Sequence, residues 1–264
     1  MAPHLSFPIA LVYIIILLIP LLTLRLLAIL PPNRPPPAKR KRGTPTRLLI
    51  VLGSGGHTAE MLAMLRNAEA SGLRWKDYTH RTWVVSSGDS VSADRAKGFE
   101  TEVAANCSGS RVKDHALGIS LMDSPEKPRA GEDVVGSYDI AILPRARRIH
   151  QSLLTTPISA LYCLYHCFRI LSSLPASQYP DLILANGPAT ATILILASLI
   201  LRFFDIRGAS KRGTMRTVYV ESWARVNRLS LSGKLLVRVV DRFLVQWPGL
   251  EGVGGRGEFL GVLV

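Results

Sequence analysis

The stretch Gly53-Ser54-Gly55-Gly56-His57-Thr58 decides the fold of this chain. It follows an apolar run, residues 47–52, that is typical of a buried strand, and it precedes a helical pattern with an apolar face at Met61 and Leu65. A strand, a glycine-rich turn and a helix in this order open α/β domains that handle nucleotides or phosphates. Glycines let the backbone turn sharply, so that its N–H groups can approach an anion at the helix N-terminus. We therefore expect this loop to bind phosphate.

Two familiar versions of this motif do not fit. No Gly-Lys-Ser/Thr follows the glycines, so the loop is not a P-loop. Thr58 stands where a dinucleotide fingerprint has its third glycine, and no acidic residue ends a second strand about 20 residues further on. The alternative to a phosphate site is a tight turn that binds nothing.

The composition points to an anionic partner. The chain has 264 residues, enough for one large domain or two small ones, and its 32 Lys and Arg against 19 Asp and Glu give a net charge of +13. Membrane headgroups, a phosphorylated substrate or nucleic acid could balance this charge. Aromatic residues make up only 7% of the chain, and no zinc-finger, RRM or KH pattern is present. We therefore expect no nucleic acid partner.

The three cysteines favour a reducing compartment, because their number is odd and small. Cys163, His166 and Cys167 share one apolar helical stretch, but no further ligand stands at a suitable spacing. We expect these side chains to pack in a core, and we expect no metal site.

An N-terminal segment is apolar enough to anchor the chain in a membrane. Residues 5–24 carry no charge, and about 20 helical residues span the hydrocarbon core of a bilayer. Arg25 could snorkel from the end of this helix. A cleaved signal peptide is the alternative, but it requires a positive N-terminal region, and no Lys or Arg precedes the segment. Residues 1–30 are therefore predicted to form a luminal N-terminus and a transmembrane anchor.

The next segment, residues 31–45, is rich in proline and basic residues. Its prolines predict a stiff polyproline spacer, and its Lys39-Arg40-Lys41-Arg42 cluster places the following residues on the cytosolic side. The cluster can also hold the domain near anionic headgroups. A nuclear localisation signal is the competing interpretation, which the adjacent spanning segment disfavours.

The remaining residues, 46–264, alternate between strand and helix patterns and predict a Rossmann-like α/β domain with a mostly parallel sheet. We expect an insertion at 107–137, where periodicity is absent, with disorder left open. A long helical region should open with Arg145 and reach about residue 174, either as a core helix or on the membrane surface. The apolar helix at 189–204 should be buried or shallowly inserted in the bilayer. A basic helix containing Arg225 and a terminal apolar strand at 259–264 complete the pattern.

Ligands of parallel sheets bind beyond the carboxyl ends of the strands. Three predicted loops lie at such ends: residues 53–58, residues 186–188 with Asn186 and Gly187, and Glu221-Ser222. Their shared edge is the expected site. No Ser-His-Asp order, metal constellation or carboxylate pair is recognisable, so the chain is interpreted as a binding half and not as a complete catalyst.

Several motifs together resemble one known family. They are the N-terminal anchor, LGSGGHTAEML at 52–62, ILPRAR at 142–147, DLILANGPATA at 181–191, YVESWARVNRLSLSGKLL at 219–236, DRFLVQWP at 241–248 and GVLV at 261–264. The chain is similar to the membrane-anchoring subunit of the endoplasmic-reticulum UDP-N-acetylglucosamine transferase of dolichol-linked oligosaccharide synthesis. The resemblance covers most of residues 47–264, and it fails near 111–136 and in the glycine-rich stretch 251–256.

This resemblance implies the amino-terminal, acceptor-binding half of a GT-B glycosyltransferase, with the donor-binding catalytic half on a separate soluble polypeptide. It implies transfer of a second GlcNAc from UDP-GlcNAc to GlcNAc-diphosphodolichol, with inversion, at the cytosolic face of the endoplasmic reticulum membrane. No cofactor and no bound metal are implied. The absence of a recognisable second Rossmann-like domain agrees with a two-subunit enzyme. We therefore expect no transfer by this chain without its partner.

By motif position, the resemblance assigns His57 and Glu221 as catalytic candidates. The residues expected to bind the acceptor or its phosphates are Gly53, Ser54, Gly55, Gly56, Thr58, Asn186, Gly187, Ser222 and Arg225. His57 could act as a base or as a phosphate partner, and the alternative is a helix-capping imidazole. For Glu221 the alternative is an ion pair with Arg225 one helical turn away.

Two other functions stay open at this point. The chain could be a membrane-tethered nucleotide-sugar or dinucleotide enzyme that acts alone, which turnover without a partner would indicate. It could also be a scaffold that only recruits a soluble enzyme to the membrane, which would make the glycine loop dispensable for activity.

Overall fold

The computed structural model describes residues 7–37, 44–114, 136–147, 151–152, 154–173, 179–187, 189–211 and 213–264. One seven-stranded sheet organises them, in the order β3-β2-β1-β4-β5-β6-β7, and every pair of neighbouring strands is parallel. The strands are β1 Arg47–Val51, β2 His80–Ser86, β3 Ser137–Leu143, β4 Leu182–Asn186, β5 Arg216–Val220, β6 Arg242–Val245 and β7 Gly257–Phe259. The order of the first six strands along the sheet is that of the Rossmann fold. The predicted α/β class is confirmed.

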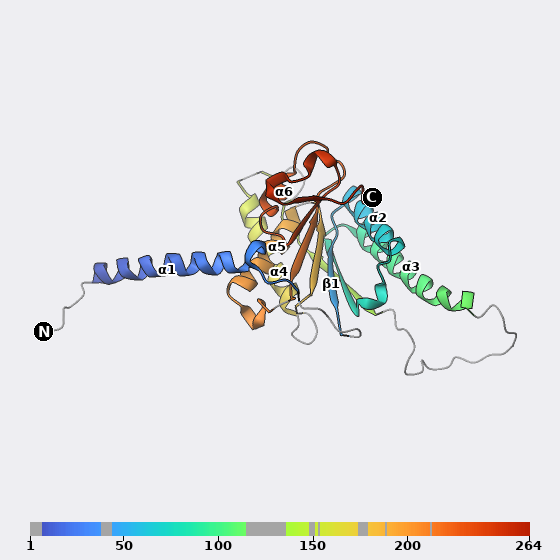
Figure 1. The fold of residues 1–264 in the computed structure, drawn as a ribbon, viewed down its shortest axis with the longest axis horizontal. Helices are drawn as coiled ribbons and strands as arrows, with labels where there is room; N and C mark the ends of the chain where they lie inside the picture. The colour runs from blue at the N-terminus through green and yellow to red at the C-terminus, as the bar shows by residue number, and fades with distance from the viewer. Residues whose placement is uncertain are drawn as a thin grey trace.

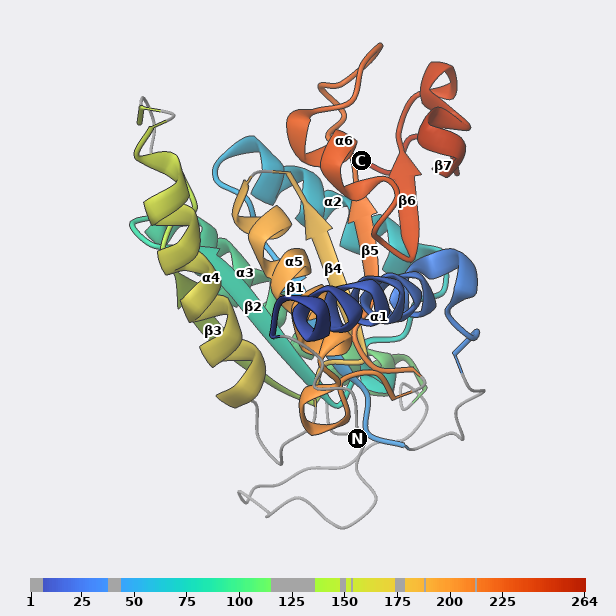
Figure 2. The same ribbon diagram turned by 90° about the vertical axis from the view of Figure 1, so that its left-hand side faces the viewer.

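Helices cover both faces of the sheet (Figures 1 and 2). Helices α2 and α3 lie on one face, and α4, α5 and α6 lie toward the other, where the N-terminal helix α1 also joins the body. The helices are α1 Phe7–Ile29, α2 Gly56–Ala70, α3 Ser90–Asp114, α4 Thr156–Ser173, α5 Ala189–Phe203 and α6 Leu231–Leu236. Short 3-10 helices occupy Pro31–Asn33, Trp75–Asp77, Ile206–Gly208, Pro248–Leu250 and Val253–Gly255.

The two layers of helices create two hydrophobic cores. Successive side chains of a strand point to opposite faces, so Leu49 and Val51 of β1 pack in one core while Leu48 and Ile50 pack in the other. Because both faces are buried, the central strands are almost continuously apolar. Cys163 and Cys167 belong to the first core, which confirms their predicted packing role.

Helix α5 lies beneath α1 and α4, and its inner face is buried in the first core. Its buried residues are Thr190, Ala191, Thr192, Leu194, Ile195, Ala197, Ser198, Leu201 and Arg202. The continuous apolar character of this helix is therefore accounted for by packing between the sheet and other helices. Of the two predicted alternatives for this helix, burial is the one that the structure shows.

Helix α1 projects away from the body (Figure 1). Among the described residues it contains the one segment, Leu11–Ile29, that is long and apolar enough to cross a membrane. The sequence predicts that Arg25 could extend toward the membrane interface. In the structure its side chain instead contacts the C-terminal end of α5. Its guanidinium donates to the carbonyls of Arg202 at 2.7 Å and Phe203 at 2.8 Å. A cation at these last carbonyls stabilises the C-terminus of α5.

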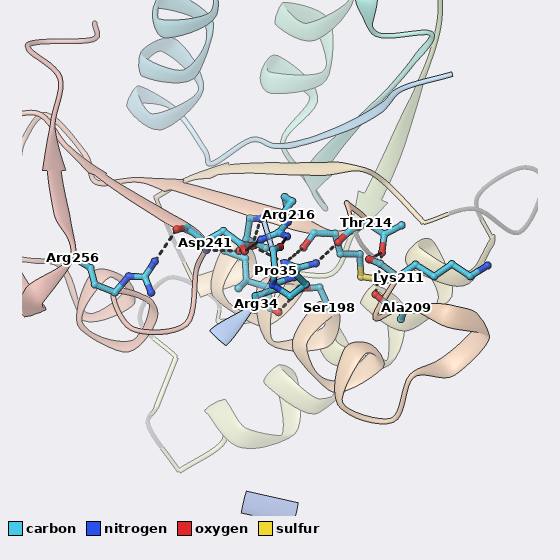
Figure 3. Close-up of polar contacts among 12 residues, drawn as sticks. Arg34, Pro35, Ser198, Ala209, Lys211, Thr214, Arg216, Asp241 and Arg256 are labelled. Atoms are coloured by element: carbon cyan, nitrogen blue, oxygen red, sulfur yellow. Dashed lines mark hydrogen bonds and ion pairs between the residues drawn. The ribbon is translucent and has the colours of Figure 1, made fainter. Parts of the chain in front are cut away.

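The described part of the proline-rich segment, residues 31–37, contacts the domain. This differs from the free spacer that the sequence predicts. Arg34 is almost fully buried and pairs with Asp241 at 2.7 Å (Figure 3). It also donates to the carbonyl of Met215 at 3.1 Å, and Arg216 pairs with the same Asp241 at 2.8 Å. The segment is therefore fastened to the domain directly after α1. Residues 38–43, which hold the basic cluster, lie outside the described residues.

Other boundaries also differ from the predicted ones. Helix α3 continues to Asp114, past the predicted start of the insertion, and residues 115–135 lie outside the described part of the chain. Helix α4 begins only at Thr156, so Arg145 lies in the loop after β3 and not in a helix. The predicted basic helix shrinks to α6, and Arg225 precedes it in a loop. The terminal strand is Gly257–Phe259, and residues 260–264 are irregular.

Candidate functional site

The strand order reverses between β1 and β4, and the carboxyl ends of these two strands flank the point of reversal. In open parallel sheets this is where ligands bind, because the connections leave toward opposite faces and open a crevice. The glycine loop follows β1, and Asn186-Gly187 ends and follows β4. Glu221-Ser222 follows β5, the next strand along. The structure therefore brings the three predicted loops to one edge.

The glycine loop makes a sharp turn into α2. Gly55 has a φ of +60°, a backbone conformation that favours glycine, and it caps the helix that begins at Gly56. Ser54, Gly55 and Gly56 are exposed, while Gly53 is buried. The first N–H groups of an α-helix have no partner within the helix, and they carry its positive end. The loop thus offers donors to an anion in solution.

A cation that the sequence analysis did not single out lies beside this loop. Arg95 of α3 is exposed, and its Nη1 lies 3.4 Å from the carbonyl oxygen of Gly55. The signal that could have found it is the parallel topology, which places the start of α3 beside the start of α2. Its charge adds to the positive end of α2.

The side chain of Thr58 lies beneath the glycine loop. It is fully buried, and its hydroxyl donates to the carbonyl of Gly53 and lies 2.7 Å from the hydroxyl of Ser92. Ser92 in turn donates to Asp89 at 2.7 Å. This network stabilises the turn between β1 and α2, so the side chain of Thr58 supports the loop.

Glu60 connects the three loops, although the sequence analysis did not single it out. Its carboxylate accepts hydrogen bonds from Asn186 Nδ2 at 3.0 Å and from Ser222 Oγ at 2.8 Å. It also lies 3.6 Å from His57 Nδ1, one turn back on α2. The spacing of His57 and Glu60, three residues apart after a glycine turn, places both side chains on one side of the helix. That spacing is the signal that could have identified Glu60.

The charges of His57 and Glu60 depend on each other. The Glu60 carboxylate raises the pKa of His57 above its ordinary value, outweighing burial, which lowers it. Burial by itself raises the pKa of Glu60, but the interactions with His57, Asn186 and Ser222 outweigh it and hold that pKa below its usual range. The pair therefore favours an imidazolium beside a carboxylate.

Gly187 allows His57 to approach the backbone of the loop after β4. It has a φ of +84°, and a Cβ at this position would lie 2.7 Å from Cγ of the His57 ring. The carbonyl of Gly187 accepts a hydrogen bond from the buried hydroxyl of Tyr219 at 3.1 Å. Burial raises the pKa of Tyr219, which keeps the phenol protonated and able to donate. The loops after β1 and β4 thus each depend on a glycine with a positive φ, Gly55 and Gly187.

Glu221 is oriented away from the exposed part of the site. Only 1% of its surface is exposed, and Oε2 accepts from the backbone N–H of Ser230 at 3.1 Å and from its hydroxyl at 3.0 Å. Ser230 caps α6 by accepting from the N–H of Gly233. A Cβ at Gly233 would lie 2.1 Å from Glu221 Oε2. Glu221 therefore secures the start of α6, which replaces the ion pair with Arg225 that was the predicted alternative.

Arg225 lies in the exposed loop between β5 and α6, where its backbone N–H donates to the carbonyl of Ser222 at 2.9 Å. Beside this loop, the rings of Trp223 and Trp247 lie 5.6 Å apart, and the indole N–H of Trp247 donates to the carbonyl of Trp223 at 2.6 Å. The loop is thus supported from β6.

Fold and site together define a class: a Rossmann-like α/β domain with one apolar N-terminal helix, a glycine loop and a charged His57–Glu60 pair at the switch point. The family is given by comparison with known proteins. A family model described as oligosaccharide biosynthesis protein Alg14 like matches residues 48–263. The chain belongs to this family.

Relatives named UDP-N-acetylglucosamine transferase subunit alg14 share much of the sequence. The protein from Aspergillus fumigatus is 42% identical, with 77% of this chain and 100% of that relative covered. The protein from Yarrowia lipolytica is 35% identical, covering 92% of this chain and 94% of its own. The human protein is 30% identical over 82% of each chain. The family predicted from the motifs is confirmed.

Proposed function

We propose that this chain is the membrane-anchoring, acceptor-binding subunit of a UDP-GlcNAc transferase. With a soluble donor-binding catalytic subunit, it adds the second GlcNAc to GlcNAc-diphosphodolichol at the cytosolic face of the endoplasmic reticulum. Its relatives are named as subunits of a UDP-N-acetylglucosamine transferase, which supports a role as a subunit of such an enzyme. The observation that carries the proposal is the exposed glycine loop with its His57–Glu60 pair at the β1–β4 switch point.

The acceptor diphosphate binds at the positive end of α2. The exposed N–H groups after Gly55, the helix dipole and the Arg95 guanidinium supply donors and positive charge. Glu60 raises the pKa of His57, which increases the fraction of the imidazole that is positively charged. We assign His57 to the diphosphate because it is the second residue of α2 and follows the exposed glycines directly.

The acceptor sugar lies toward the end of β5, beside Asn186, Ser222 and Arg225. Glu60 aligns the first two of these side chains through its two hydrogen bonds. Glu221 is a positioning residue in this scheme, because its carboxylate holds α6 and the loop that carries Arg225. The departing UDP is stabilised by the donor-binding subunit.

The anchor keeps this edge near the lipid substrate. In this proposal helix α1 spans the membrane, which its length and apolar composition support, and the basic residues that follow it favour a body on the cytosolic side. Because Arg25 and Arg34 fasten the helix and the linker to the domain, the site keeps a defined orientation toward the bilayer.

Reconstitution tests this function. Membranes containing this chain, the soluble subunit, or both are supplied with labelled UDP-GlcNAc and GlcNAc-diphosphodolichol. We expect a disaccharide lipid only when both chains are present. Transfer by this chain alone would replace the proposal with a self-sufficient enzyme. Transfer by the soluble subunit alone, at the rate of the pair, would leave this chain as a scaffold.

A further inference from the structure

A cavity lies on the carboxyl edge of the sheet, and its lining does not include the His57–Glu60 pair. It has a volume of about 660 Å³ and lies between the end of β3 and helix α4. Its lining consists of Ser87, Ile142, Pro144, Arg145, Ser159, Tyr162 and His166. Cavities of roughly 300–1,000 Å³ are the size that small-molecule ligands occupy. The function proposed above does not use this cavity.

The lining combines a cation with apolar walls. Among the described residues, the guanidinium of Arg145 makes one hydrogen bond, from Nε to the carbonyl of Ser87 at 3.1 Å, which leaves its terminal N–H groups for a ligand. Ile142 and Tyr162 are both more than half exposed where they line the cavity. The ring of His166 packs edge-on against Tyr162 at 4.6 Å between centroids. A charged group joined to an apolar chain matches this combination.

The outer face of α4 continues the apolar wall. Four large side chains repeat at helical spacing and are mostly exposed: Ile158 at 72%, Leu161 at 65%, Tyr162 at 58% and Tyr165 at 56%. The opposite face of α4 carries Cys163 and Cys167 in the core. A helix that is apolar on both faces needs a cover on its outer side.

The direction of α1 indicates what lies beside this stripe. Figure 2 looks along α1 toward the body, and α4 and α5 lie on the side of the sheet from which α1 leaves. A bilayer crossed by α1 therefore lies on the α4 side. A lipid chain could pass from the bilayer along the stripe to the cavity without crossing the sheet.

The spacing of the strands connects this cavity to the diphosphate site. Strand β3 is two positions from β1 in the sheet, so their carboxyl ends are about 10 Å apart at about 4.8 Å per strand. Ser87 of the cavity follows β2, the strand between them. A ligand with its diphosphate at the glycine loop would place its lipid end toward the cavity.

We propose that this cavity binds the lipid end of a polyprenyl diphosphate acceptor. Arg145 contacts the phosphate next to the lipid, and Ile142 and Tyr162 contact the first prenyl units. The rest of the chain follows the outer face of α4 into the bilayer. This assignment rests on the proposed function, because it takes the acceptor from there, and it adds the residues that recognise the lipid.

The test measures the KM of two acceptors with the assembled two-subunit enzyme in membranes. One is GlcNAc-diphosphate with a long prenyl chain, and the other carries a methyl group in place of the lipid. We expect Arg145→Ala to raise the KM of the prenyl acceptor about tenfold, as for a lost hydrogen bond to a charged group. Tyr162→Ser should raise the KM of the prenyl acceptor severalfold and leave that of the methyl acceptor unchanged. The KM of UDP-GlcNAc should not change in either variant.

Two controls separate the cavity from general membrane contact. Phe204→Ser removes an exposed aromatic residue after α5 that neither lines the cavity nor belongs to the α4 stripe, and Arg169→Ala removes an exposed positive charge. Equal KM values for Tyr162→Ser and Phe204→Ser with the prenyl acceptor would overturn the assignment.

A binding measurement keeps this inference separate from the proposed function. A photoreactive prenyl diphosphate is cross-linked to the assembled complex, and the labelled peptides are identified. Label at Ile142 and Tyr162 supports the cavity even if no acceptor is glycosylated, in which case the proposed function fails alone. Label confined to other segments, in a complex that transfers GlcNAc, overturns the cavity alone.

Discussion

The imidazole of His57 packs against the backbone of Gly187 so closely that a Cβ on Gly187 would lie 2.7 Å from the ring. This contact joins the loop after β1 to the loop after β4, which are the two sides of the switch point. Because Glu60 holds Asn186 from the same helix, α2 controls the position of the loop after β4.

Replacing Gly187 with alanine tests this contact. The added Cβ meets the His57 ring, and the φ of +84° is strained for any side chain. We expect Gly187→Ala to lower the Tm by about 4 °C and to raise the KM of the lipid acceptor. Gly252→Ala is the matched control, because its φ is +72° but no atom lies within 4 Å of the new Cβ. If both variants bind acceptor like the wild type, the His57–Gly187 contact has no part in the site.

Neutralising Glu60 should change how stability depends on pH. The pKa of His57 is raised and that of Glu60 is lowered, so their attraction is fully present below the ordinary His value of 6.5 and above the ordinary Glu value of 4.5. It is lost as the pH rises through the raised pKa of His57. We expect the wild type to lose about 2 °C more in Tm than Glu60→Gln between pH 6 and pH 8.

NMR titration of His57 gives a direct check, since its pKa should fall in Glu60→Gln. Glu102→Gln is the control, because Glu102 pairs with Arg66 at an exposed position on the outer helices. An unchanged His57 pKa in Glu60→Gln would mean that the carboxylate does not set the charge of the imidazole.

Asp241 should contribute strongly to stability. It pairs with Arg34 and Arg216. The charge of the buried Arg202 also acts on Asp241, and the guanidinium of Arg202 has no hydrogen-bond partner among the described residues. Burial, with the charge of Arg202, lowers the pKa of Arg34 to about 10. We expect Asp241→Asn to cost about 3 kcal/mol, because buried cations lose their counter-charge.

The control for Asp241 is Glu258→Gln, which breaks an exposed pair with Arg242 and should cost less than about 1 kcal/mol. Thermal unfolding in detergent measures both variants. Equal losses would show that the linker is not fastened through Asp241.

Much of this fold can be predicted from the sequence, because the central strands are apolar and segments with helical spacing follow them. The docking of the linker cannot, since the pairing of Arg34 with Asp241 joins residues 207 positions apart. Within the site, the glycine loop and Asn186 are visible as turns, whereas Glu60 looks like an ordinary polar position on α2. For Glu221, the family resemblance predicts a catalytic role, but the hydrogen bonds of its carboxylate to the helix-capping Ser230 could not be predicted, because they join two loop positions nine residues apart.

The C-terminal residues divide into two sets with different expected roles. Leu263 packs in the second core and its carbonyl accepts from Asn67 at 3.0 Å, whereas Leu260 and Val262 are each 56% exposed. We expect residues 259–264 to help bind the soluble subunit, because exposed apolar side chains at the end of the chain favour contact with a partner. Deleting them should release that subunit from membranes, and Leu260→Ser with Val262→Ser should do so without a loss in Tm. Full retention of the subunit by both variants would limit these residues to packing.

Gly56→Val tests the central claim most directly, namely that an anionic acceptor meets the backbone of the glycine loop. A Cβ at Gly56 would meet no atom within 4 Å, and the φ of Gly56 is not positive. The substitution should therefore keep the fold intact and obstruct only a ligand. Gly98→Val on α3, also free of contacts within 4 Å, is the control for the cost of a β-branched residue in a helix. The measurement is GlcNAc transfer to the lipid acceptor by assembled complexes of equal subunit content. The account predicts that Gly56→Val lowers the rate of transfer at least about a hundredfold, as expected when several charge-assisted hydrogen bonds are lost. Gly98→Val should transfer GlcNAc at a nearly normal rate. Normal transfer by Gly56→Val would contradict the account.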